Sequence, residues 1–122
     1  MNSTEVTMDR NPKPKRFEAL DVAIEAAALT LKLVAKATPA LRPIADQAIR
    51  SSSSVAANLS EGQGREGRDS LKHFRIAYAE AREIDVHLRL LAGAGAINGQ
   101  QAKTAIALFD RVRAMTWKLL AK

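Results

Sequence analysis

Cysteine is absent from this chain of 122 residues, and aromatic residues make up only 4% of it. Without cysteine the chain forms neither disulfide bonds nor thiolate metal sites, which is typical of proteins in reducing compartments. The scarcity of aromatic residues also disfavours a β-sheet protein, because strands are rich in aromatic and β-branched side chains. No run approaches the roughly 18 consecutive apolar residues of a membrane span. These absences predict a cytoplasmic protein without a membrane-spanning segment.

The first 16 residues are polar and lack the apolar stretch of a secretory signal, which also favours the cytoplasm. Prolines alternate there with basic residues, which are Lys13, Lys15 and Arg16. We expect a disordered, basic N-terminal arm over residues 1–16. A chain of this length buries one core and not two, so residues 17–122 are expected to form a single domain.

Hydrophobic residues make up 47% of the chain, and many of them are alanine, a composition that favours helices. Four segments repeat apolar residues at three- and four-residue spacing, over residues 17–37, 43–61, 70–92 and 98–122. The links between them are short, so successive helices are expected to be antiparallel neighbours. The sequence therefore predicts an all-α fold, an antiparallel up-down-up-down four-helix bundle.

The apolar stripes predict which side of each helix faces the core. In the first segment the expected inward residues are Phe17, Leu20, Ile24, Ala27, Ala28, Leu31 and Val34. Asp69 is expected to cap the third helix, and Asn98 with Gln101 forms a capping-box pattern before the fourth. Gly62 is expected to end the second helix. Several apolar side chains lie outside a single stripe and predict self-association: Leu29, Leu33, Leu108, Met115 and Trp117.

Three patterns resemble ligand-binding or catalytic motifs, and a structural role is favoured for each. Residues 62–67 match G-x-G-x-x-G, but a dinucleotide fingerprint follows a strand, whereas an amphipathic helix precedes this segment. Two histidines and two glutamates share one side of the third helix, namely His73, Glu80, Glu83 and His87. A di-iron bundle needs Glu-x-x-His pairs, and the sequence has none. The serines at 51–54 are in phase with an apolar stripe, so they predict a tight helix contact. We therefore expect a non-enzymatic protein with no catalytic residue, metal or cofactor.

The net charge of +6 is unevenly distributed, with +2 in residues 1–16 and +4 in residues 94–122. Such asymmetry is compatible with an acidic partner such as RNA or DNA, or with a surface that only keeps the protein soluble. The candidate nucleic-acid contacts are Lys13, Lys15, Arg16, Arg65, Arg68, Lys103, Arg111, Arg113, Lys118 and Lys122. Only Tyr78 and Trp117 are placed to stack on bases, so no sequence-specific recognition is expected.

Arg50, Asn58 and Glu61 lie close together on the second helix, among uniformly small residues. We interpret them as a polar cluster that fixes helix packing or an interface, with ligand binding as the alternative.

The segment from residue 47 to residue 62 reads QAIRSSSSVAANLSEG, and Gly64-Arg65 follows it. It resembles a family of four-helix-bundle proteins named after 23S rRNA intervening sequences, and residues 74–77 and 81–83 resemble that family's third helix. The resemblance implies a bacterial bundle that assembles as a homopentamer and has no enzyme chemistry. It also implies relatives in diversity-generating retroelements, accessory variability determinants, that bind nucleic acid and a reverse transcriptase.

The expected partners are therefore other copies of this chain, RNA or DNA, and a protein such as a reverse transcriptase. The leading hypothesis is an oligomeric bundle that binds nucleic acid non-specifically or scaffolds a nucleoprotein complex. The alternative is a structural, self-assembling module for protein–protein interaction.

Overall fold

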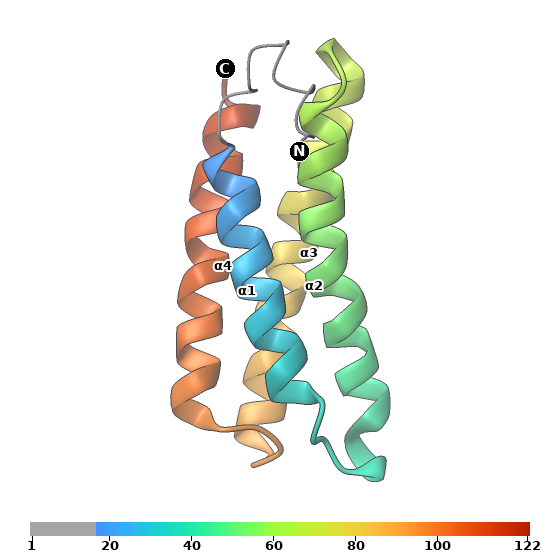
Figure 1. Ribbon diagram of the computed structural model, residues 1–122, viewed down its shortest axis with the longest axis vertical. Helices are drawn as coiled ribbons and strands as arrows, with labels where there is room; N and C mark the ends of the chain where they lie inside the picture. Colours follow the sequence, from blue (N-terminus) through green and yellow to red (C-terminus); the bar gives the residue numbers. More distant parts are fainter. Residues whose placement is uncertain (1–16) are drawn as a thin grey trace, which may run out of the picture.

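The computed structural model describes residues 17–122, which fold into four α-helices and one short 3₁₀ turn. The helices are α1 (Glu18–Val34), α2 (Arg42–Gln63), α3 (Gly67–Gly93) and α4 (Gly99–Leu120), and the turn η2 (Pro39–Leu41) leads into α2. Successive helices run in opposite directions, so α1 begins and α4 ends at the same end of the bundle (Figure 1). The predicted all-α, up-down-up-down bundle is confirmed. The arm expected over residues 1–16 lies outside the described residues.

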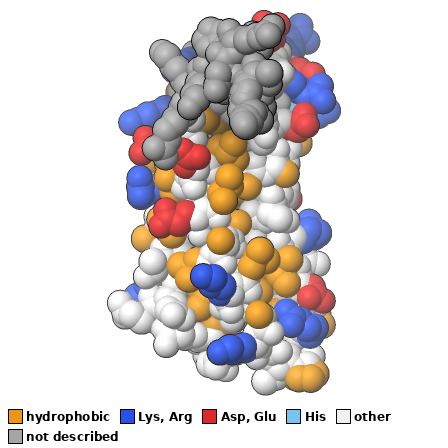
Figure 2. Space-filling view, viewed as in Figure 1, with side chains coloured by type: hydrophobic (Ala, Val, Ile, Leu, Met, Phe, Trp, Pro, Cys, Tyr) orange, Lys and Arg blue, Asp and Glu red, His pale blue; other side chains and the backbone are white. Residues whose placement is uncertain are grey.

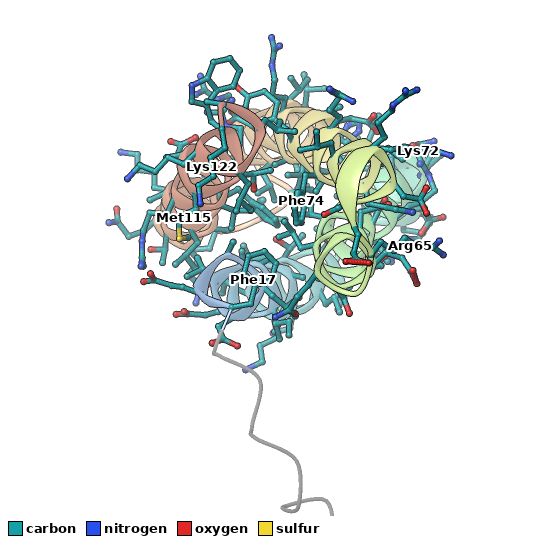
Figure 3. The ribbon with its side chains drawn as sticks, turned by 90° about the horizontal axis from the view of Figure 1, so that it is seen from above. Phe17, Arg65, Lys72, Phe74, Met115 and Lys122 are labelled. Carbon is teal, nitrogen blue, oxygen red and sulfur yellow. The ribbon has the colours of Figure 1, made fainter. Side chains whose placement is uncertain are left out.

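The helices surround the core in chain order. α1 packs against α2, α2 against α3, α3 against α4, and α4 against α1, and the α2–α3 interface is the most extensive. Seen from above, α1 and α3 are therefore diagonal to each other, and Phe74 points into the centre of the bundle (Figure 3). The largest fully buried side chains are Phe109, Leu59, Ile84 and Leu88. Removing these apolar surfaces from water is the main source of stability.

The side of α2 that faces the core is built from small residues, as predicted. Ala45, Ala48, Ser51 and Ser52 are fully buried there. The Ser52 hydroxyl donates a hydrogen bond of 3.0 Å to the carbonyl oxygen of Ile49, so its burial leaves no unpaired donor. Small side chains let neighbouring backbones approach closely, which explains why serine occurs in the middle of this helix.

The side of α1 that enters the core differs from the predicted one. Ala27 and Val34 are buried as expected, but Ile24 and Leu31 are 53% and 43% exposed. The other buried residues of α1 are Ala19, Val22, Ala23, Ala26, Thr30 and Leu33. The helix carries two apolar stripes, and the stripe of mainly small residues faces the core, where α2 also presents small residues. The larger side chains are left outside.

The ends of the helices follow local backbone geometry. α3 begins at Gly67, which has a positive φ of 57°, and its N-cap is Glu66. The prediction that Asp69 caps this helix is therefore wrong, and Asp69 lies in the first turn, where the helix dipole favours a carboxylate. The predicted cap of α4 is confirmed, because the Asn98 Oδ1 accepts a hydrogen bond of 2.9 Å from the Gln101 backbone N–H.

Gly62 does not end α2, contrary to prediction, because the helix continues to Gln63. Gly62 is buried within the last turn. A Cβ atom at Gly62 would lie 2.5 Å from Cε1 of Phe74 on α3. Close contact between the two helices, rather than a helix stop, therefore requires glycine at this position.

Candidate nucleic-acid interface

The outer side of α3 carries four arginines at intervals of seven residues. They are Arg68, Arg75, Arg82 and Arg89, and all four are exposed. Two turns of an α-helix contain about seven residues, so side chains at this spacing point in nearly the same direction. Only Arg68 was among the predicted contacts. The seven-residue spacing is the sequence signal that identifies the other three.

Basic side chains of α4 meet this row across the groove between α3 and α4. Arg82 and Arg113 line one surface hollow of about 440 Å³. Arg89 and Lys103 line another, of about 760 Å³, near the start of α4. In Figure 3, side chains that end in nitrogen project outward from α3 and α4, on the side away from α1. We term the four arginines of α3, together with Lys103, Arg113 and Lys118 of α4, the basic face.

Three carboxylates, Glu83, Asp85 and Asp110, also line these hollows, and Glu83 lies 3.4 Å from Arg50 of α2. Arg89 Nε donates a hydrogen bond of 2.7 Å to Asp85, and this bond raises the pKa of Arg89 above its ordinary value. Asp110 pairs with Arg113 one turn further along α4. Each carboxylate is therefore matched by an arginine, and the remaining cations of the basic face give it an excess of positive charge.

The other predicted contacts are distributed over different parts of the surface. Arg111 lies 3.5 Å from Glu18 across the α1–α4 boundary, and Lys122 follows the end of α4. Arg65 donates hydrogen bonds to Glu61 at 3.1 Å and to Asp69 at 2.9 Å, which raise its pKa. Because Arg65 already binds two carboxylates, it is a poor candidate for a phosphate contact. Lys13, Lys15 and Arg16 lie outside the described residues.

The residues predicted to form one polar cluster are instead spread along the α2–α3 interface. Arg50 Nη2 donates to Gln47 and lies 3.4 Å from Glu83 Oε2. Asn58 Oδ1 lies 2.9 Å from Nδ1 of His73. Glu61, one turn further on, pairs with Arg65. The three residues thus take part in separate interactions that join or flank the two helices.

Glu83 is the centre of a polar network that the sequence did not reveal. The Ser51 hydroxyl donates a hydrogen bond of 2.8 Å to Glu83 Oε2, and His87 Nε2 lies 3.2 Å from the same oxygen. The hydrogen bond from Ser51, followed by that from His87, lowers the pKa of Glu83. Ser51 is fully buried, so this carboxylate also satisfies a buried hydroxyl. The arrangement is that of a packing contact.

The histidines and glutamates of α3 do not gather into a metal site. Within residues 17–122, no three His, Asp or Glu side chains are grouped closely enough to hold a metal ion. His73 faces Asn58, whereas His87, fourteen residues further along α3, faces Glu83, so the helix uses its histidines in different contacts.

The sequence matches the family of 23S rRNA-intervening sequence proteins over residues 15–118. The chain belongs to this family. It is also similar to a crystal structure of a protein of unknown function from the S23 ribosomal protein family of Bacteroides thetaiotaomicron, with a TM-score of 0.77. The two share 21% sequence identity, and the alignment covers 86% of this chain and 96% of the other. At this level of identity the similarity shows the fold alone. No curated protein matches the chain significantly.

For this member of the 23S rRNA-intervening sequence protein family, the matched region contains the whole basic face. The family match thus covers the α3–α4 groove as well as the core. Among the described helices, none combines the length and apolar character required to cross a membrane.

Proposed function

We propose that this chain is a non-enzymatic, self-assembling bundle that binds nucleic acid through the basic face without reading its sequence. The observation that supports this most directly is the row of arginines on α3. It runs along most of the helix, from Arg68 to Arg89, and Arg82 and Arg89 line hollows that also hold cations of α4. A long row of cations fits a linear polyanion better than it fits a small anionic ligand.

The row is long enough to span several phosphates of one strand. An α-helix rises about 1.5 Å per residue, so successive arginines are about 10.5 Å apart and the row is about 32 Å long. That length equals roughly nine nucleotides along one strand of DNA. Contacts from arginine to phosphate position a protein on nucleic acid but carry no sequence information. Because bound phosphates release their counterions, affinity is expected to fall steeply as salt increases.

Charge reversal within the row tests the proposal. The variant Arg75→Glu/Arg82→Glu is expected to bind a labelled RNA at least tenfold more weakly than the unaltered chain, measured by fluorescence anisotropy. A plot of log affinity against log salt concentration is also expected to become shallower by roughly two, because two phosphate contacts are lost.

The matched control is Lys32→Glu/Lys36→Glu, which changes the net charge equally at the exposed end of α1. It is expected to retain both the affinity and the salt slope of the unaltered chain. Equal losses of RNA affinity in the two variants would show that affinity depends only on the net charge of the protein. That result would contradict a dedicated binding face. No binding by the unaltered chain at low salt would refute the nucleic-acid proposal as a whole.

The exposed stripe of α1 supports the self-assembling part of the proposal. Ile24, Ala28 and Leu31 repeat at four- and three-residue spacing, as in a coiled-coil seam, and all three are exposed. Phe17 and Leu20 continue the stripe but pack partly against the core. Figure 2 shows hydrophobic side chains along the face that α1 presents and beside its border with α2. We propose a second copy of this chain as the partner of that stripe. A homopentamer is the assembly that the family resemblance implies.

Self-assembly without nucleic-acid binding is the second candidate function, and the α1 stripe favours it independently of the basic face. The salt series above separates the two candidates. A purely structural module would assemble normally but would leave RNA unbound at low salt.

A further inference from the structure

We propose that Tyr78 and Trp117 form a stacking platform that holds an unpaired base, so that the basic face binds single-stranded rather than duplex nucleic acid. This inference rests on the proposed nucleic-acid function and specifies its ligand. The two rings come from α3 and α4, on opposite sides of the groove. Their centroids lie 5.9 Å apart, with an angle of 46° between the ring planes.

The exposure of Trp117 distinguishes it from a core residue. It is 58% exposed, although it is the only tryptophan of the chain, and Tyr78 beside it is half-buried. Tyr78 supports one side of the indole, while more than half of the Trp117 surface remains open to solvent. A base stacked there would cover apolar surface that the fold leaves exposed.

Cations surround the two rings. Arg113 and Lys118 line the same surface hollow as Tyr78 and Trp117, and its volume is about 540 Å³. Arg75 and Arg82 lie three residues before and four residues after Tyr78, which makes them its neighbours on the surface of α3. The acidic group of the hollow, Asp110, pairs with Arg113. Cations on both sides of an aromatic platform suit a ligand with a flat ring between two phosphates.

The positive charge around the two rings and the exposure of Trp117 together indicate which class of ligand binds there. An apolar protein partner would gain little from four surrounding cations, whereas a nucleic-acid strand gains both stacking and phosphate contacts. In a duplex the faces of the bases are covered by their neighbours, so only unpaired bases can reach Trp117. The phosphate row alone would bind both forms, and the platform adds a preference for the single strand.

The intrinsic fluorescence of the chain reports on this position, because Trp117 is its only tryptophan. The probes are a twelve-nucleotide single-stranded RNA, the blunt duplex of equal length, and a single strand of abasic nucleotides. The single-stranded RNA is expected to quench Trp117 fluorescence, whereas the duplex and the abasic strand leave it unchanged. Trp117→Ala is expected to bind the single strand about tenfold more weakly, with unchanged duplex affinity and unchanged salt slope.

Two control variants accompany the measurement. Trp117→Phe retains an aromatic ring and is expected to recover most of the single-strand affinity. Leu90→Ala removes an exposed apolar side chain of α3, next to Arg89. This variant is expected to bind all three probes as the unaltered chain does.

The failure of the platform and the failure of the proposed function give different results. If the unaltered chain binds single strand and duplex equally and its fluorescence does not change, the platform is refuted and the phosphate row stands. If it binds neither probe at low salt, the proposed function fails and the platform with it. A lower oligomeric mass of Trp117→Ala would assign the tryptophan to an interface between copies and would also refute the platform.

Discussion

Gly62 lies where the end of α2 meets the first half of α3, and the ring of Phe74 occupies the space that a side chain would fill. Cε1 and Cδ1 of that ring lie 2.5 and 2.7 Å from the position of a Cβ atom on Gly62. Phe74 is itself fixed by the ring of Phe17, with 6.0 Å between the ring centroids. An added methyl group would have to displace the Phe74 ring.

We expect Gly62→Ala to destabilise the fold by about 1–3 kcal/mol, the usual cost of overpacking a core. Alanine gains up to about 1 kcal/mol over glycine within a helix, which is too little to offset the clash. Urea denaturation measures the difference. Gly64→Ala is the control, because its φ is −84° and its added Cβ would meet nothing closer than 3.7 Å. Equal stabilities of the two variants would show that Phe74 gives way freely.

The ionisation of Glu83 is coupled to the fold. Its pKa is lowered in the folded chain by hydrogen bonds from Ser51 and His87. A lowered folded-state pKa means that the ionised carboxylate stabilises the fold above the unfolded-state pKa, which is about 4.3. That contribution is lost as the pH falls through the folded-state pKa. The side chain is 41% exposed, so solvent screening keeps the contribution small.

Glu83→Gln is therefore expected to lower the free energy of unfolding at pH 7 by less than about 1 kcal/mol. The difference from the unaltered chain should narrow as the pH falls through the lowered folded-state pKa of Glu83, because the protonated glutamate is then neutral, as glutamine is. Urea midpoints from pH 7 to pH 3 provide the measurement. Glu25→Gln, on the exposed side of α1, is the control and should leave the free energy of unfolding at pH 7 unchanged. A difference that is constant over the whole pH range would contradict a role for the charge.

At the scale of the helices, periodicity predicts α2, α3 and α4 well because each has one dominant apolar stripe. Ala48 on α2, Phe74 and Ile84 on α3, and Phe109 on α4 lie on these stripes, and all four are buried. α1 has two such stripes, and hydrophobicity alone selects the one with the larger side chains. The core selects the other, because small residues of α1 fit the small residues of α2. Packing against a neighbour, which no single segment encodes, decides between the two.

The basic face was only partly predictable for a similar reason. α4 carries four basic residues and one acidic residue, so its net charge alone identifies it as a basic segment of the sequence. α3 carries five basic and four acidic residues, and its sum is close to zero. Within α3, Glu80 and Glu83 pair with Arg50 of α2, and Asp85 pairs with Arg89. Pairing therefore occupies much of the acidic charge of α3, although Glu83 and Asp85 also line the hollow beside Arg82.

The outward stripe of α1 leads to a prediction about assembly. Ile24→Glu/Leu31→Glu is expected to reduce the oligomer to a monomer in light scattering, because it places two carboxylates in the proposed contact between copies. The unfolding free energy of the monomer should change little, since both side chains already lie largely in solvent.

The control is Val86→Glu/Leu90→Glu on α3, where the native side chains are 54% and 55% exposed. This variant has the same chemistry and similar exposure, but it lies away from α1 and should retain the oligomeric mass. Loss of assembly in the control alone would place the interface on α3 and not on α1.

In the whole molecule, the surface proposed for self-assembly and the surface proposed for nucleic-acid binding lie on different sides of the bundle. α1 carries three acidic residues and one basic residue beside its apolar stripe, whereas the basic face lies across the bundle on α3 and α4. Copies that associate through α1 would leave every basic face open. An assembly built in this way would present several phosphate-binding rows to one nucleic-acid molecule.

This arrangement predicts that affinity depends on the length of the nucleic acid. One row is about 32 Å long, so a ten-nucleotide strand fills a single subunit, whereas a forty-nucleotide strand reaches several. Linked contacts raise avidity by about a hundredfold or more when the geometry allows simultaneous binding. A forty-nucleotide strand offers about four times as many binding sites as a ten-nucleotide strand. The unaltered chain should bind the longer strand more tightly by much more than this factor of four.

Ile24→Glu/Leu31→Glu should retain the affinity for the ten-nucleotide strand and lose the extra affinity for the forty-nucleotide strand, as measured by fluorescence anisotropy at one fixed salt concentration. If the monomeric variant keeps the same length dependence, the subunits bind independently and assembly plays no part in nucleic-acid binding.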